Sequence, residues 1–218
     1  MKKLGILFIA VLLVQLTQAQ DEISNNREET QVLFSGHKSN GWYGAFTMGY
    51  SQIDGRDALI SGARGAFVFD QKLAIGLGGY GFVNNLDYHS YYDNNPDRQF
   101  MLAGGYGGLI IEPIVAGRKA VHLSFPVLFG IGGVALVDNH NWGWDWDFDP
   151  YHPNSEYDND VFFVIEPSAE VEFNLTRWFR AAAYASYRFT SNIELYQTDS
   201  KVLDGFSFGM TFKFGKLN

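Results

Sequence analysis

From Gly41 onward, apolar and polar side chains alternate with a period of two in eight separate segments. A period of two is the geometry of a β-strand, whose successive side chains point to opposite faces. The segments cover 41–53, 58–69, 73–84, 100–112, 119–137, 161–174, 177–190 and 205–215. Each is long enough to supply the roughly 9–11 residues with which a tilted strand crosses a bilayer. We therefore predict an all-β chain of eight antiparallel strands.

The connections between these segments have an ordered pattern of lengths. Three are long: 85–99, 138–160 and 191–204. After the first hairpin, short and long connections strictly alternate. Up-and-down barrels of bacterial outer membranes have short turns on the periplasmic side and long loops outside. The pattern predicts an eight-stranded up-and-down transmembrane barrel whose long loops lie at one end.

The two faces of the segments differ in chemistry. In the last segment Phe206, Phe208 and Phe214 share one face, and Ser207 and Lys213 share the other. The polar faces of neighbouring segments carry ionised groups, and we assign them to the interior. Lipid offers no hydrogen-bond partner, so the last strand must pair with the first. A soluble lipocalin-like periplasmic ligand binder, with the apolar faces inside, is the alternative.

The first 40 residues differ from the rest of the chain. Lys2 and Lys3 precede an apolar run from Leu4 to Leu16, and Thr17-Gln18-Ala19 follows it with small residues, which predicts a secretory signal peptide over 1–19. Residues 20–40 are polar, and we expect a mobile segment there, followed by the barrel over 41–218. The chain has no cysteine, which excludes disulfides, and its net charge of −8 argues against nucleic acid as a partner.

The leader, the eight alternating segments, the ordered loops and the final stretch GFSFGMTFKF at 205–214 resemble the small OmpA/OmpX-type outer-membrane barrels of Gram-negative bacteria. The resemblance covers about 41–215 and implies an outer-membrane location without a periplasmic domain. Many members of that group end on an aromatic residue, whereas this chain continues past Phe214 to Asn218.

Ionisable residues on the inward faces form the first candidate site. Unpaired buried charges are costly, so we expect these residues to form a salt-bridge plug that closes the tube. They are Arg64, Glu112, His122, Glu166, Glu170, Glu172, Arg180 and Arg188. A turn centred on Gly117 predicts that Glu112 lies opposite His122, and a tight turn near Leu175 sets Arg180 opposite Glu170 or Glu172. A narrow pore or proton path is the alternative role.

His122 and Ser124 share a face and suggest a second alternative, a membrane-embedded lipid hydrolase. A serine nucleophile needs a base within hydrogen-bond reach and an oxyanion hole. The sequence identifies neither, so we assign no catalytic residue, predict that the chain is not an enzyme and expect no cofactor.

The loop 138–160 is the second candidate site. Aromatic and acidic residues alternate along it: Trp142, Trp144, Asp145, Trp146, Asp147 and Asp149. Such a loop can contact a glycan or an extracellular protein, or its rings can rest in the membrane interface. The acids could also hold calcium, but the glycine and distal glutamate of a helix-loop-helix calcium site are missing, and we assign no metal. We predict a structural or surface-interaction role through the long loops, with outer-membrane lipid and an extracellular protein or glycan as partners.

Overall fold

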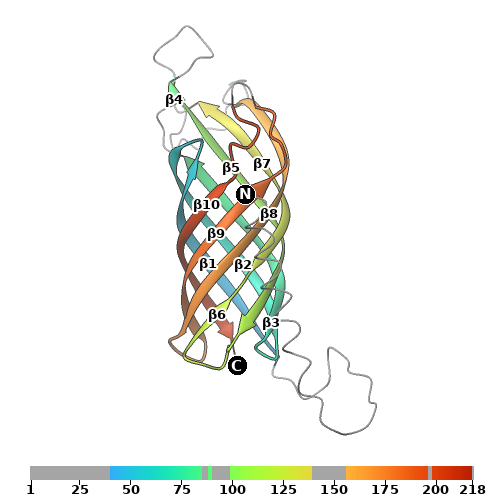
Figure 1. Cartoon of the computed structure of the whole chain (residues 1–218), viewed down its shortest axis with the longest axis vertical. Helices are drawn as coiled ribbons and strands as arrows, with labels where there is room; N and C mark the ends of the chain where they lie inside the picture. The colour runs from blue at the N-terminus through green and yellow to red at the C-terminus, as the bar shows by residue number, and fades with distance from the viewer. Residues whose placement is uncertain (1–39, 85–87, 90–98, 139–155, 196–197, 218) are drawn as a thin grey trace, which may run out of the picture. The chain divides into compact units, whose positions relative to one another are not determined.

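The computed structural model describes residues 40–84, 88–89, 99–138, 156–195 and 198–217 (Figure 1). Within them lie ten strands: β1 (Asn40–Ile53), β2 (Arg56–Phe69), β3 (Leu73–Asn84), β4 (Tyr88–His89), β5 (Gln99–Val115), β6 (Val121–Ser124), β7 (Val127–Asp138), β8 (Glu156–Asn174), β9 (Phe179–Thr190) and β10 (Gly205–Lys216). In this part of the chain no helix has the length and apolar character needed to cross a membrane.

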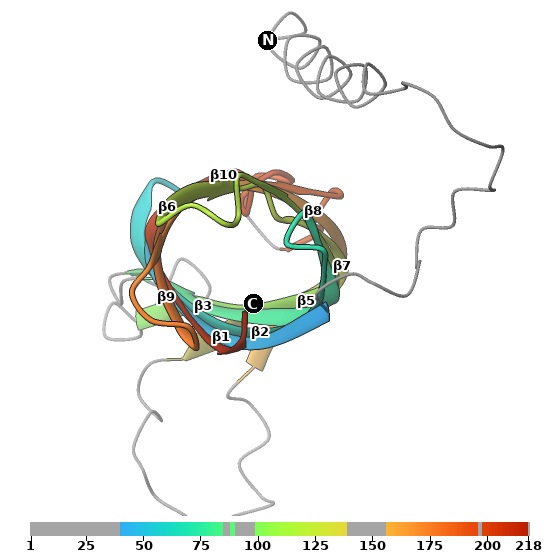
Figure 2. The same cartoon turned by 90° about the horizontal axis from the view of Figure 1, so that it is seen from below.

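The strands form a closed antiparallel ring. Each pairs with the next along the chain, from β1 through β2, β3, β5, the β6–β7 unit, β8 and β9 to β10. The ring closes between β10 and β1, whose register runs from Trp42 opposite Lys216 to Ser51 opposite Ser207. Figure 2 looks along the ring from the end where the short turns lie. The prediction of eight antiparallel strands closed on themselves is confirmed.

The fifth predicted segment, 119–137, is divided in the structure. Phe125 and Pro126 interrupt it, since proline has no backbone N–H for the ladder. The carbonyl of Pro126 still accepts a hydrogen bond from the amide of Ser168 at 2.8 Å. Because β6 and β7 both lie between β5 and β8, they serve as one strand of the ring.

The first hairpin needs only two turn residues. Asp54 and Gly55 have φ angles of 56° and 69°, respectively. Two successive residues with positive φ match the hairpin turn that follows the right-handed twist of its strands, and glycine adopts this conformation without steric cost. The turn is therefore shorter than the predicted 54–57, and β2 starts at Arg56.

The apolar faces point outward. Phe67, Phe163 and Phe206 expose 68%, 72% and 70% of their surface, whereas Glu172 and Arg188 expose none. The predicted orientation of the two faces is therefore correct. Strands surrounded by lipid need apolar side chains on the outside and a partner for every backbone edge, and this closed ring has both.

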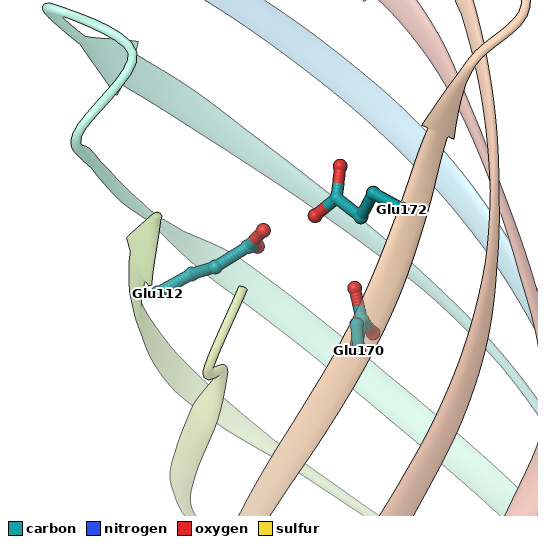
Figure 3. A group of neighbouring side chains, drawn as sticks. All are labelled: Glu112, Glu170 and Glu172. Atoms are coloured by element: carbon teal, nitrogen blue, oxygen red, sulfur yellow. The ribbon is translucent and has the colours of Figure 1, made fainter. Parts of the chain in front are cut away.

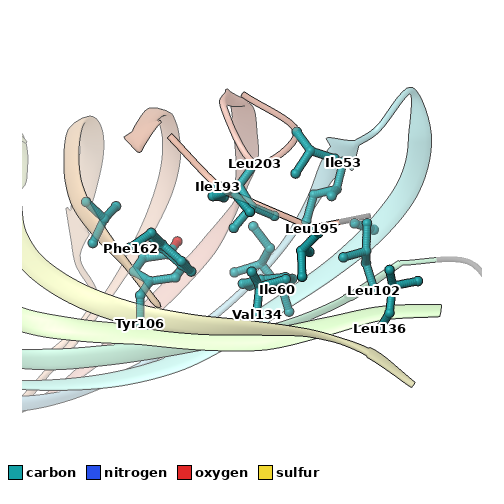
Figure 4. Close-up of a cluster of buried hydrophobic side chains, with 14 of the residues drawn as sticks. Ile53, Ile60, Leu102, Tyr106, Val134, Leu136, Phe162, Ile193, Leu195 and Leu203 are labelled. Atoms are coloured by element: carbon teal, nitrogen blue, oxygen red, sulfur yellow. The ribbon is translucent and has the colours of Figure 1, made fainter. Parts of the chain in front are cut away.

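The interior is not polar throughout, contrary to expectation. A large apolar cluster fills the long-loop end of the barrel (Figure 4). Four of its members come from the connection between β9 and β10: Ile193, Leu195, Val202 and Leu203. A smaller cluster, which includes Tyr43, Val68 and Leu217, fills the short-turn end. Most of the charged residues thus lie between two apolar clusters, whereas Arg188 packs against Phe82 and Tyr106 of the larger one.

Candidate functional site

Lys213 of β10 occupies the centre of a three-carboxylate cluster. Its Nζ lies 2.6 Å from Glu112 Oε1, 2.6 Å from Glu172 Oε1 and 2.9 Å from Glu170 Oε2. Figure 3 shows the three carboxylates converging from β5 and β8. Their oxygen atoms are close enough together to hold a metal ion. The ammonium group takes the central position that such an ion would need, so the cluster is neutralised from within the chain.

Arg64 of β2 extends this cluster along the barrel. Its Nη2 donates to both carboxylate oxygens of Glu170 at 2.7 Å, and it lies 3.9 Å from Glu112. The Tyr43 hydroxyl donates to Glu112 Oε2. The Lys213 ammonium lies 5.0 Å from the centre of the Tyr43 ring, a cation–π distance. Charged hydrogen bonds of this kind are stronger than neutral ones, and in this cluster they connect five strands: β1, β2, β5, β8 and β10.

His122 and Arg180 meet the same cluster at Glu172. The Glu172 Oε2 atom is 3.1 Å from His122 Nε2 and 3.5 Å from Arg180 Nη1. Arg180 Nη2 also donates to the carbonyl of Leu217 at 2.9 Å. The last residues of the described chain are therefore tied to the buried network.

Two predicted pairings across turns are wrong. Ser124 is paired with Ile114, so Glu112 does not lie opposite His122. His122 instead faces Glu172 across the other neighbouring strand. Arg180 is paired with Asn174, although its side chain reaches Glu172. The first turn lies later in the chain than predicted, at 116–120, and the second is longer, at 175–178. Either change moves the opposing partner along the strand.

Glu166 and Arg188 form a second, separate group nearer the long-loop end. Glu166 accepts hydrogen bonds from Tyr106 Oη at 2.5 Å and Ser186 Oγ at 2.6 Å. Arg188 Nε donates to the carbonyl of Leu203 at 2.7 Å, and its Nη1 donates to Tyr106 Oη at 3.4 Å. No acid among the described residues lies within ion-pair distance of Arg188. Tyr106 connects the two charges, and Arg188 fixes the apolar loop above it.

The eight predicted lumen residues all lie inside the barrel, in these two groups. Lys213 was not among them, although the alternation of its strand already assigned it to the polar face. The register sets Lys213 directly opposite Arg180. Two like charges on one interior face require nearby acids, and that is the signal that could have identified Lys213. With it, four fixed bases balance four acids, and the interior is neutral when His122 is neutral.

A cavity of about 20 Å³ separates the two groups. It is bordered by Arg64 and Glu170 on one side and by Glu166 and Ser186 on the other. A space of this size holds about one water molecule. It is a polar gap within a filled interior.

The possible hydrolase residues do not form a nucleophile and base. The Ser124 hydroxyl donates to Glu170 Oε2 at 3.2 Å, and His122 faces Glu172. Both side chains are buried in the lumen, where a lipid ester has no access. This geometry offers no support for acyl transfer. The other candidate site, Trp142, Trp144, Asp145, Trp146, Asp147 and Asp149, lies outside the described residues.

No family model matches the chain, and no curated protein matches its sequence. Among solved structures, neisserial surface protein A shares the fold with a TM-score of 0.52 at 8% identity, over 80% of this chain and 96% of that one. Ail, the attachment invasion locus protein of Yersinia pestis, crystallised with the heparin analogue sucrose octasulfate, gives a TM-score of 0.46 at 10% identity, over 82% and 99%. By its closed ring and its likeness to neisserial surface protein A, the chain has the fold of small eight-stranded outer-membrane β-barrels.

Proposed function

We propose that the protein is a non-conducting barrel of the bacterial outer membrane that contacts an extracellular protein or glycan through its long-loop end. The observation that carries this proposal is a buried charge network, neutral overall, with an apolar cluster inside each end of the barrel. Because the interior of such a barrel is filled, the loops are the part of the protein that a partner can contact.

The exterior supports the membrane location. Large apolar side chains are exposed on every strand of the ring, among them Phe46, Leu77, Leu109, Phe129 and Phe208. Soluble monomers rarely expose contiguous apolar patches of more than a few hundred Å². A soluble lipocalin-like binder would have its charges outside and its rings inside, the reverse of the observed arrangement.

The filled interior argues against the pore alternative. An ion entering from the long-loop end meets the buried side chains of Leu203 and Ile193, and one entering from the other end meets Leu217. Between these layers the acids are paired with bases or accept hydrogen bonds from hydroxyl groups. Moving an ion into this interior would require it to break those contacts without water to replace them.

Strands at the long-loop end extend beyond their neighbours. Pairing of β5 with β7 continues to Phe100 opposite Asp138, and pairing of β8 with β9 stops at Val164 opposite Thr190. The first eight residues of β8 therefore project past the end of β9. The loop predicted over 138–160 is shorter in the structure, because β7 continues to Asp138 and β8 starts at Glu156; residues 139–155 connect the two strands at this end. The aromatic and acidic residues of this loop remain our candidates for the contact.

A groove of about 510 Å³ lies at the same end, between the first hairpin and the 191–204 connection. Asp199 and Asp204 supply carboxylates to it, and Tyr50, Tyr187 and Phe206 line its other part. Since Phe206 belongs to the apolar exterior, the acidic part of the groove is what gives the proposed partner a second point of contact.

Loop deletion tests this proposal. Deletion of 140–154 leaves all of β8 in place, so we expect this variant to insert into detergent micelles and to keep the heat-dependent gel migration of a folded barrel. On glycan and cell-surface protein arrays, it should no longer bind the molecules that the parent chain binds. Planar-bilayer recordings should show no channel activity for either protein. Steady conductance by the parent, or unchanged array binding after deletion, would refute the proposal.

The division of the chain into a leader over 1–19, a mobile segment over 20–40 and a barrel over 41–218 is part of this proposal. Mature protein isolated from bacterial outer membranes should begin at Gln20 in N-terminal sequencing. Recovery of the chain with Met1 retained would contradict the assignment of a cleaved signal peptide.

A further inference from the structure

The short-turn end of the barrel carries a concentration of positive charge. Its turns and the end of β10 contain five exposed basic residues: Lys72, Arg118, Lys119, Arg177 and Lys216. Asp70 is the one acid in 70–72, 116–120, 175–178 and 215–217, which gives this rim a formal charge of +4. The described parts of the opposite end, in 54–57 and 191–204, have five acids and two bases, a charge of −3.

Hydrogen bonds join the basic turns into one continuous rim. The Ile114 amide donates to the Lys72 carbonyl at 2.7 Å, which links the first turn to the second. Asn174 Nδ2 donates to the Lys119 carbonyl at 2.6 Å and links the second turn to the third. The Gly215 amide donates to the Trp178 carbonyl at 2.9 Å and links the third turn to β10. The five cations therefore belong to a single fixed surface, the end viewed in Figure 2.

Exposed aromatic residues lie directly beside these cations. Trp42, opposite Lys216 in the β1–β10 register, is 55% exposed, and Trp178, next to Arg177, is 60% exposed. The Trp178 ring lies 6.2 Å from the ring of Phe214. Tryptophan prefers the boundary between hydrocarbon and lipid headgroups. The two tryptophans thus set the level of the headgroups at the basic rim.

We propose that this rim binds the phosphodiester headgroups of anionic phospholipid in the membrane leaflet that faces the short turns. The inference rests on the proposed membrane location and adds a lipid class to it. Charge complementarity supports it, because a basic residue near an anionic lipid surface contributes about 1 kcal/mol. Asp70 is within 3.9 Å of Lys72 and 3.7 Å of Arg118, which leaves Lys119, Arg177 and Lys216 farther from that one acid of the rim. These exposed surface pairs are weak and yield readily to a phosphate.

The test uses the full chain in neutral detergent, with native mass spectrometry to measure retained phosphatidylglycerol or phosphatidylcholine. We expect phosphatidylglycerol to bind more tightly. The variant Lys119→Gln/Arg177→Gln should lose about 25-fold of that affinity, about fivefold for each cation removed. The control Arg56→Gln/Lys201→Gln removes the same charge at the opposite end and should keep it. Heat-dependent gel migration verifies that each variant is folded.

The possible outcomes separate this inference from the proposed function. A chain that stays in aqueous solution without detergent would overturn both. A chain that inserts but binds the two lipids equally, or loses phosphatidylglycerol equally in both double variants, would overturn the rim alone. Displacement of bound phosphatidylglycerol by soluble glycerol phosphate at the same concentration would also overturn the rim proposal. So would wild-type protein that co-sediments with cell-wall sacculi and shows no preference between the two lipids.

Discussion

Replacement of Lys213 by methionine should destabilise the barrel, because it leaves three buried carboxylates without the base at their centre. Methionine is of similar length, so the change removes a charge with little loss of volume. Glu112, Glu170 and Glu172 would then keep their charges within contact distance of one another, with Arg64 and Arg180 as the remaining bases. Removing one partner of a buried ion pair costs about 3–5 kcal/mol, and we expect a cost within that range.

The assay is urea unfolding in phospholipid vesicles, followed by gel migration without boiling. Lys213→Met/Glu112→Gln is the matched variant, because it restores charge balance with three bases and three acids. Its glutamine can still accept the hydrogen bond from Tyr43 that Glu112 accepts. We expect it to recover at least half of the lost stability. Calcium should also stabilise Lys213→Met, because the vacated centre is surrounded by three carboxylates, and should leave the parent chain unchanged. A single variant as stable as the parent would refute the reasoning.

Three further changes test other parts of the structure. Met210→Arg places a charge on the exterior near the middle of β10 and should cost about 2–4 kcal/mol in the same assay, while Met210→Leu should be nearly neutral. Arg188→Gln removes a charged hydrogen bond to the Leu203 carbonyl, which is worth about 1.5–3 kcal/mol. Protease should then cut the 191–204 connection faster while the barrel is still folded, and an unchanged cleavage rate would contradict this. Gly76→Val should prevent folding, because a Cβ at this position would lie 1.9 Å from the Gly65 carbonyl oxygen, and a folded variant would show that the strands can move apart.

Local alternation was sufficient to predict the strands and their faces. Side chains such as Phe163 and Glu166 fall on opposite sides of one strand whatever their partners are, so the sequence alone assigns them. Pairing across turns depends on the conformation of the turn residues, which alternation does not report. For that reason the expected partners of His122 and Arg180 were wrong while their inward orientation was right.

The apolar layer at the long-loop end was missed for a different reason. The segment 191–204 was predicted only as a long outer loop, and its acids and polar residues outnumber its apolar ones. Its four large aliphatic residues occur as two pairs, Ile193 with Leu195 and Val202 with Leu203, and all four are buried. Only the closed ring provides the apolar space that they enter. Burial of a loop in a barrel is a property of the tertiary fold, so periodicity along one segment could not predict it.

The buried charges also oppose a slip in the register of the strands that carry them. A strand that slips by one residue turns its whole interior face outward. For β10 this would move Lys213 from the carboxylates into hydrocarbon, at a cost of about 2–4 kcal/mol near the middle of the bilayer and less toward the interface. A slip of β8 would expose Glu166, Glu170 and Glu172 together. Apolar side chains inside the barrel would not impose such a penalty, because they are equally compatible with lipid. The charge network therefore distinguishes inside from outside on the strands that carry it.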